Sequence, residues 1–142
     1  MQRLRPRFSG HFSTVHTIRL RRPWLRSADP QSPPDKVDVP DTTPLAVTGG
    51  DRVTYRRVFN RPTGLTPTDV VWLSIPQYAA DSIEVRINDT LIGRSTTGDP
   101  IRVDITAQLQ TSNQLAVTLK PSGSSPAALD GQVTLQIESP RS

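Results

Sequence analysis

Residues 83–119 read IEVRINDTLIGRSTTGDPIRVDITAQLQTSNQLAVTL and decide the fold. Within this stretch, apolar side chains alternate with polar ones in three short runs. The apolar members of these runs are Ile83, Val85 and Ile87, then Ile101, Val103 and Ile105, then Leu115, Val117 and Leu119. A period of two residues is typical of a β-strand with one buried and one solvated face. The stretch therefore predicts three strands that each bury one face in a common core.

Turn-forming residues separate these runs. Asn88 and Asp89 both tolerate left-handed backbone angles, so they predict a tight turn. After this turn, residues 91–95 are expected to run back antiparallel to residues 83–87. The sequence Thr-Gly-Asp-Pro at 97–100 predicts the next turn.

Strands are also predicted on both sides of this stretch. They cover residues 16–20, 45–48, 52–59, 70–75 and 132–138. Residues 70–75 form a nearly continuous apolar run, which favours a central strand. Short strands with frequent turn signals between them are the pattern of a β-sandwich. The chain is therefore predicted to be all-β, with two antiparallel sheets and eight or nine short strands.

The proline-rich segment 27–44 is predicted to differ from the rest. It holds five prolines and four aspartates. Prolines at this density oppose both helix and sheet pairing, so an extended connection that wraps around the core is expected. In the predicted strand 52–59, Arg57 interrupts the apolar face and marks either a bulge or a rim position. Residues 79–82 are predicted to form one helical turn.

Size and composition set the limits of what the chain can be. A chain of 142 residues suits one domain and can bury about two-thirds of its unfolded surface. No apolar run is long enough for a membrane-spanning helix. The chain has no cysteine, which excludes disulfides, thiolate catalysis and zinc–thiolate sites. Proteins without disulfides exist in every compartment, so the localisation stays open.

The charge is distributed unevenly. Residues 1–26 hold seven arginines and no acid, whereas the rest of the chain holds 10 basic and 13 acidic residues, so the overall charge is +4. Residues 1–14 are predicted to be a flexible basic arm before a single domain at 15–142. Such an arm either binds nucleic acid or an anionic surface, or is a solvated tail. Its composition also fits an organellar transit peptide.

Several short motifs follow one another in an order that resembles a known family. They are Tyr-Arg-Arg-Val-Phe at 55–59, Val-Trp-Leu at 71–73, Val-Arg-Ile-Asn-Asp at 85–89, Ile-Gly at 92–93, Val-Asp-Ile-Thr at 103–106 with Leu109, and Asn-Gln-Leu-Ala-Val at 113–117. This order resembles the galactose-binding-domain-like jelly roll. It is most similar to the sugar-binding domain that precedes the catalytic barrel in family 2 glycoside hydrolases, such as β-galactosidases and β-glucuronidases.

The resemblance covers residues 53–119 and implies both a fold and a role. The implied fold is a jelly-roll β-sandwich. The implied role is non-catalytic, because in this family the catalytic glutamates sit on the barrel. Two residues depart from the family pattern. Asp89 stands where the family has glycine, which a tight turn accepts more easily, and Val103 stands where the family has an aromatic residue.

The polar residues do not form a recognisable catalytic set. Asp99 and Asp104 are close in sequence, but glycoside hydrolysis needs two carboxyls facing each other across a cleft. Asp104 or Thr106 is instead expected to cap a short helical turn. No catalytic residue and no cofactor is therefore predicted. A structural calcium ion held by Asp99, Asp104 and Asp130 stays open, since oxygen ligands suit it and their spacing is not diagnostic.

Aromatic residues indicate where a sugar could stack. Tyr55 and Trp72 lie in apolar strands and are predicted to be in the core. Tyr78 follows a proline in a loop and is expected to be exposed. Trp24 is predicted to end the first strand, either as a lid packed on the sandwich or as part of a ligand surface.

The predicted ligand site is therefore borne by loops. Its residues are Tyr78, Arg94, Thr97 and Asp99, with Trp24 as a further candidate. The leading hypothesis is a non-catalytic carbohydrate-binding-like or scaffolding module. Two alternatives stay open: a protein-interaction or oligomerisation module without a small ligand, and binding to nucleic acid or an anionic surface through the arginine-rich arm. Possible partners are thus a carbohydrate, another protein chain or, less favoured, a nucleic acid.

Overall fold

The computed structural model describes residues 13–28, 33–44, 52–123 and 125–140. These ranges form ten strands and one short 3-10 helix, η1. The elements are β1 (Ser13–Arg19), β2 (Trp24–Ser27), β3 (Asp35–Val37), β4 (Val53–Asn60), β5 (Val70–Ile75), β6 (Ser82–Ile87), β7 (Thr90–Ser95), β8 (Ile101–Asp104), η1 (Thr106–Gln108), β9 (Ser112–Lys120) and β10 (Thr134–Pro140). No helix in the described ranges has the length and hydropathy needed to cross a membrane.

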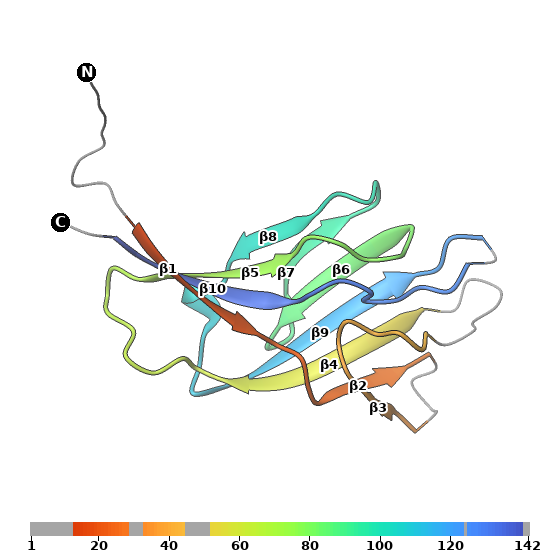
Figure 1. The fold of residues 1–142 in the computed structure, drawn as a ribbon, viewed down its shortest axis with the longest axis horizontal. Helices are drawn as coiled ribbons and strands as arrows, with labels where there is room; N and C mark the ends of the chain where they lie inside the picture. Colours follow the sequence, from red (N-terminus) through yellow and green to blue (C-terminus); the bar gives the residue numbers. More distant parts are fainter. Residues whose placement is uncertain (1–12, 29–32, 45–51, 124, 141–142) are drawn as a thin grey trace, which may run out of the picture.

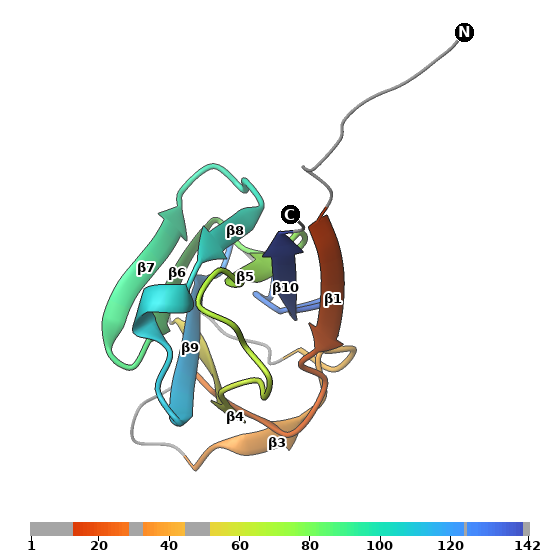
Figure 2. The ribbon, with the colours of Figure 1, turned by 90° about the vertical axis from the view of Figure 1, so that its left-hand side faces the viewer.

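The strands form two antiparallel sheets that lie face to face (Figures 1 and 2). One sheet has four strands in the order β1-β10-β5-β8, and the other has six in the order β3-β2-β4-β9-β6-β7. The strands β1 and β10 pair along their whole length, so the first and last described segments lie side by side. The predicted all-β jelly-roll sandwich is confirmed, with ten strands instead of eight or nine.

The alternating aliphatic residues form the core, as the sequence predicted. In β6 and β9, every second side chain is buried. The buried aliphatic members are Ile83, Val85, Ile87, Leu115, Val117 and Leu119, none more than 1% exposed. Each such side chain stabilises the fold by about 1.5–3 kcal/mol. Because the two strands are neighbours in register, their other faces together form a continuous solvent-facing surface.

The tight turn predicted between β6 and β7 is confirmed. Asn88 and Asp89 have φ angles of 51° and 69°, both in the left-handed region. Two hydrogen bonds stabilise this conformation at Asn88. Its backbone N–H donates to the carbonyl of Gln114, and its side-chain oxygen accepts from the Gln114 N–H. The turn is thereby tied to β9. Asp89 shows that aspartate can occupy the position where the family that this sequence resembles has glycine.

Two local predictions are wrong. The proline-rich segment does pair, since residues 35–37 form β3 against β2. Residues 79–82 do not form a helical turn; Ala79 instead bridges to Ala128. Two backbone hydrogen bonds of 2.9 Å join Ala79 and Ala128, and nearby Gly131 lies so close to Gln77 that a Cβ would be 2.8 Å from the Gln77 carbonyl oxygen. A long-range contact of this kind outweighs the local preference for a turn.

In the N-terminal part of the chain, the element boundaries differ from those predicted from the sequence. The arm predicted at 1–14 lies mostly outside the described residues, and Ser13 already belongs to β1. Trp24 does not end the first strand but begins β2. The strand predicted at 45–48 also lies outside the described residues.

Candidate ligand-binding groove

The structure brings three of the five sequence-predicted site residues together. The Tyr78 hydroxyl donates a 2.7 Å hydrogen bond to the backbone carbonyl of Asp99, and the Thr97 hydroxyl donates to the Asp99 carboxylate. The Asp99 N–H donates to the hydroxyl of Ser95. Tyr78 is only half-buried, but its ring packs against the core. The polar groups of this loop cluster are thus largely satisfied by one another.

The other two predicted site residues lie elsewhere. Arg94 stands on β7 opposite Glu84 and borders a separate depression with Arg52 and Lys120. Trp24 is fully buried, and its ring N–H donates to the carbonyl of Leu20. A ligand therefore cannot stack on Trp24 in this structure.

Of the two strand aromatics predicted to be in the core, one lies there and the other does not. Tyr55 is fully buried, as predicted. Trp72 is not a core residue but half-buried on the outer face of the four-stranded sheet. Its ring N–H donates to Glu138 over 3.1 Å, and the Arg102 guanidinium carbon lies 4.0 Å from the ring centroid. The guanidinium covers one face of the indole, which is a favourable cation–π contact.

A buried charged cluster stabilises the six-stranded sheet near β2. The Arg26 guanidinium and the Tyr55 hydroxyl both donate 2.6 Å hydrogen bonds to one carboxylate oxygen of Asp41, and the Thr43 N–H donates to the other. Burial alone would raise the pKa of Asp41, but these hydrogen bonds outweigh it and hold the pKa below its usual range. Burial and the Asp41 carboxylate raise the pKa of Tyr55. The Arg26, Tyr55 and Thr43 groups all form hydrogen bonds with Asp41, so this cluster is structural.

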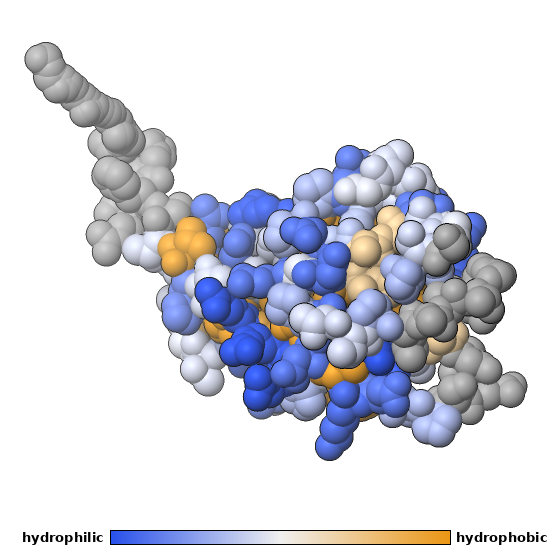
Figure 3. Space-filling view, turned by 45° about the vertical axis from the view of Figure 1, so that its right-hand side comes forward, coloured by the Kyte–Doolittle hydropathy of each residue, from blue (hydrophilic) through white to orange (hydrophobic). Residues whose placement is uncertain are grey.

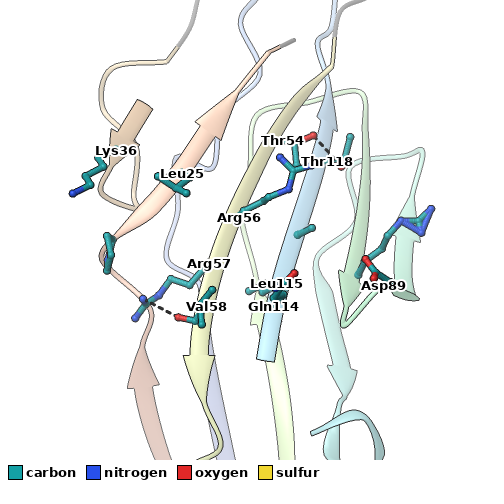
Figure 4. Close-up of a pocket in the computed structure, with 13 residues that line it drawn as sticks. Leu25, Lys36, Thr54, Arg56, Arg57, Val58, Asp89, Gln114, Leu115 and Thr118 are labelled. Atoms are coloured by element: carbon teal, nitrogen blue, oxygen red, sulfur yellow. Dashed lines mark hydrogen bonds between the residues drawn. The ribbon is translucent and has the colours of Figure 1, made fainter. Parts of the chain in front are cut away.

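An open groove crosses the outer face of the six-stranded sheet (Figure 4). Its volume is about 570 Å³. The side chains that line it come mainly from the solvent-facing positions of β2, β3, β4, β6 and β9. They are Pro23, Leu25, Lys36, Thr54, Arg56, Arg57, Val58, Arg86, Asp89, Gln114, Leu115, Ala116 and Thr118. None of these was a predicted site residue.

One cross-strand row runs through this groove and spans all six strands. Consecutive members of the row are paired in register on neighbouring strands. The row reads Lys36, Leu25, Arg56, Ala116, Arg86 and Leu91. Ala116 lies between two arginines, and its small side chain leaves room between theirs. Hereafter this set of six residues is called the basic row.

The residues on either side of the basic row supply hydroxyl, amide and apolar groups. Thr54 and Thr118 face each other on β4 and β9 with their hydroxyls 3.3 Å apart. On the opposite side of the row, Val58 pairs with Gln114. These groups can donate and accept hydrogen bonds, and they offer apolar contact beside the charges.

Arg57 was predicted to mark either a bulge or a rim position, and it occupies a rim position. The register between β4 and β9 continues unbroken through Arg57, so it marks no bulge. Its side chain reaches the end of the groove and donates to the carbonyl of Val58 (Figure 4). Its Nε is buried and has no hydrogen-bond partner among the described residues. Burial lowers the pKa of Arg57.

The exposed apolar residues do not form a single patch. Figure 3 shows hydrophilic side chains over most of the face that it presents, with hydrophobic ones in separate spots. The large exposed hydrophobic residues are Val15, Leu25, Val58 and Leu91. Leu25, which is 40% exposed, and Val58 both line the groove. Apolar surface and basic charge therefore coincide there.

The candidate calcium ligands do not meet. Within the described ranges, no three or more His, Cys, Asp or Glu side chains are grouped so that they could hold a metal ion. Asp104 instead accepts hydrogen bonds from the N–H and hydroxyl of Thr106 at the start of η1. Asp104 thus contacts the first residue of η1 but is not its N-cap, because the N-cap is Ile105, which makes no side-chain capping hydrogen bond. The predicted cap at Asp104 or Thr106 is therefore wrong.

Sequence and structural comparisons give different results for this chain, because only the structural ones find similar proteins. No protein-family model and no curated protein matches its sequence. An FMN-binding β-glucuronidase from Faecalibacterium prausnitzii L2-6 matches with a TM-score of 0.74 and 17% identity over 89% of this chain. A Bifidobacterium dentium β-glucuronidase, solved with coumarin-3-O-glucuronide, matches with a TM-score of 0.71 and 18% identity over 95% of this chain.

A third match is a Bacteroides uniformis β-glucuronidase, with a TM-score of 0.71 and 19% identity over 87% of this chain. This chain covers 23%, 31% and 18% of the three enzymes, respectively. Another similar β-glucuronidase is described as a member of glycoside hydrolase family 2. The resemblance expected from the sequence is therefore confirmed at the level of fold, and the chain corresponds to only a part of each enzyme.

Proposed function

We propose that this chain is a non-catalytic carbohydrate-binding module whose ligand lies in the groove of the six-stranded sheet. The observation that carries the proposal is the groove itself. It is an open trough of about 570 Å³ lined by hydroxyl, amide, guanidinium and short apolar side chains. Sugars present hydroxyls and C–H groups along their length, so a trough with this lining complements them.

The composition of the groove supports binding and not hydrolysis. Asp89 supplies the single carboxylate among the lining residues. Hydrolysis of a glycosidic bond requires two carboxyl groups about 5–9.5 Å apart. The β-glucuronidases that share this fold are three to five times longer than the chain. Their similarity supports a role that accompanies an enzyme acting on glycans, with the reaction itself carried out outside this chain.

The loop cluster of Tyr78, Thr97 and Asp99 is the competing location for a ligand. Tyr78 is the aromatic residue of that cluster, and its hydroxyl is already bonded to the Asp99 carbonyl. A sugar at this place would have to break existing hydrogen bonds or stack on a ring that also packs against the core. We therefore favour the groove, where a ligand meets side chains that are exposed.

Filling the floor of the groove should weaken binding strongly without unfolding the protein. Ala116→Ile adds a branched side chain between Arg56 and Arg86, at a strand position where isoleucine is favoured. Its free energy of unfolding should stay within about 0.5 kcal/mol of wild type. Affinity for any glycan identified on an array of neutral and acidic oligosaccharides should fall at least tenfold, about 1.4 kcal/mol.

Two matched variants serve as controls in that titration. Thr17→Ile adds the same kind of side chain to β1, on the exposed face of the other sheet, and should leave the affinity unchanged. Tyr78→Ala removes the aromatic ring of the loop cluster. Binding that survives Ala116→Ile but disappears with Tyr78→Ala would move the ligand to the loop cluster and refute the groove.

A further inference from the structure

The basic row places a positive charge on every second strand of the six-stranded sheet. Lys36, Arg56 and Arg86 belong to β3, β4 and β6, with Leu25 and Ala116 on the strands between them. Neighbouring strands lie about 4.8 Å apart. The Cα atoms of successive basic residues are therefore about 10 Å apart, in a line perpendicular to the strands.

These charges are poorly neutralised by the protein. In the part of the chain that the structure describes, no carboxylate lies within 4.0 Å of the Arg56 or Lys36 side-chain nitrogens, and Arg86 has Glu84 at 3.7 Å. The lining of the groove holds four basic side chains and one acidic side chain. Like charges gathered on one face repel one another, so an anionic ligand that bridges them would relieve this repulsion.

We infer that the groove recognises an acidic glycan through carboxylates that recur at every second sugar along the basic row. This inference rests on the proposed function. The spacing of about 10 Å is roughly the length of a disaccharide unit. A uronate-containing chain laid across the strands would thus bring one carboxylate to each of Arg56 and Arg86. A guanidinium pairs with a carboxylate through two parallel hydrogen bonds.

The rest of the groove favours this ligand over a neutral glycan or a nucleic acid. No aromatic side chain is among the described residues that line it. Binding to single-stranded nucleic acid usually depends on aromatic stacking of the bases, and neutral sugars commonly stack on aromatic rings. Leu25 and Val58 instead offer apolar contact to sugar C–H groups, and Thr54 and Thr118 offer hydroxyls. Charge pairing is therefore the main source of specificity.

The test compares two forms of one oligosaccharide. Hyaluronan hexasaccharide, in which uronate alternates with a neutral sugar, is titrated into the full chain at low ionic strength. The same hexasaccharide with its carboxyls reduced to alcohols is the matched neutral probe. The acidic form should bind at least about tenfold more tightly, and its affinity should fall as salt is added.

Charge-removing variants then locate the site. Arg56→Gln combined with Arg86→Gln should reduce the affinity for the acidic hexasaccharide at least about tenfold. Arg19→Gln combined with Arg61→Gln removes the same charge from positions outside the groove. This control should keep the affinity within about twofold, provided that both double variants retain the wild-type circular dichroism spectrum.

The remaining outcomes separate this inference from the proposed function. Equal binding of both hexasaccharides would overturn the inference but leave carbohydrate binding intact. If neither form binds and an array of other glycans also gives no signal, both fail. If a single-stranded DNA oligomer of equal charge binds as tightly as hyaluronan, the groove is a site for polyanions in general and the inference is wrong.

Discussion

Asp41→Asn should destabilise the protein by about 3 kcal/mol. Asp41 is buried, and its carboxylate accepts hydrogen bonds from Arg26, Tyr55 and Thr43. Asparagine keeps the shape and one acceptor oxygen but removes the charge. The Arg26 guanidinium then stays buried without its main counter-ion, which is costly in a medium of low dielectric constant.

The measurement is urea denaturation at pH 7, followed by tryptophan fluorescence. Asp38→Asn is the matched control, because Asp38 pairs with Arg22 over 3.2 Å but the side chains are 56% and 61% exposed, respectively. An exposed pair contributes little, so this control should change the free energy of unfolding by less than about 0.5 kcal/mol. Equal effects of the two variants would contradict the structural role of the cluster.

The pH dependence of the Asp41 effect follows from its lowered pKa. A carboxyl whose pKa is lower in the folded state stabilises the fold above its unfolded pKa of about 3.9. That contribution is lost as the pH falls through the lower, folded-state pKa. Because asparagine does not titrate, the difference in stability between wild type and Asp41→Asn should shrink below about pH 4. A difference that stays constant down to pH 2 would contradict the assignment.

Asn113→Asp should have a similarly large effect and destabilise the protein by about 3 kcal/mol at neutral pH. Asn113 is fully buried. Its amide nitrogen donates to the carbonyls of Gln110 and Phe59, and its oxygen accepts from the Gln110 N–H and from the Asn88 amide. All four hydrogen-bonding positions of the amide are thus used. A carboxylate cannot donate to the two carbonyls and adds a buried negative charge.

This variant should behave differently with pH from the wild-type protein. Burial should raise the pKa of the introduced carboxyl, since the charged form is disfavoured. The destabilisation should therefore decrease as the pH falls through that raised pKa and the carboxyl becomes a neutral donor. Gln114→Glu, the same change at the exposed neighbouring residue, should cost less than about 0.5 kcal/mol. A cost for Asn113→Asp as small as that of the control would show that the amide is dispensable.

Much of the fold could be predicted because its signals are local. The alternation in β6 and β9 and the turn at Asn88 and Asp89 depend on the sequence of the segment itself. The errors arose where distant contacts decide. β3 forms because β2 offers it a partner, and Ala79 is extended because its backbone pairs with that of Ala128. A single sequence does not reveal such partners.

The groove was missed for a related physical reason. Alternation alone assigns Arg56, Arg86 and Ala116 to solvent-facing positions, where charged residues are ordinary. That these residues lie together in one groove depends on the register of three strands, which places Ala116 between the two arginines. The predicted ligand site was instead based on aromatic residues expected to be exposed. Trp24 was a candidate but is buried, and Trp72 was predicted to be in the core, although it lies on an outer face.

The proposed position of the glycan is across the outer face of the six-stranded sheet. Amide chemical shifts in 15N-labelled protein, recorded during titration with hyaluronan hexasaccharide, test it most directly. We expect the largest shifts at residues 54–58, 86 and 114–118, with little change at Tyr78, Thr97 and Asp99. Shifts concentrated on that loop cluster, or no saturable shifts anywhere, would rule out binding of this glycan in the groove.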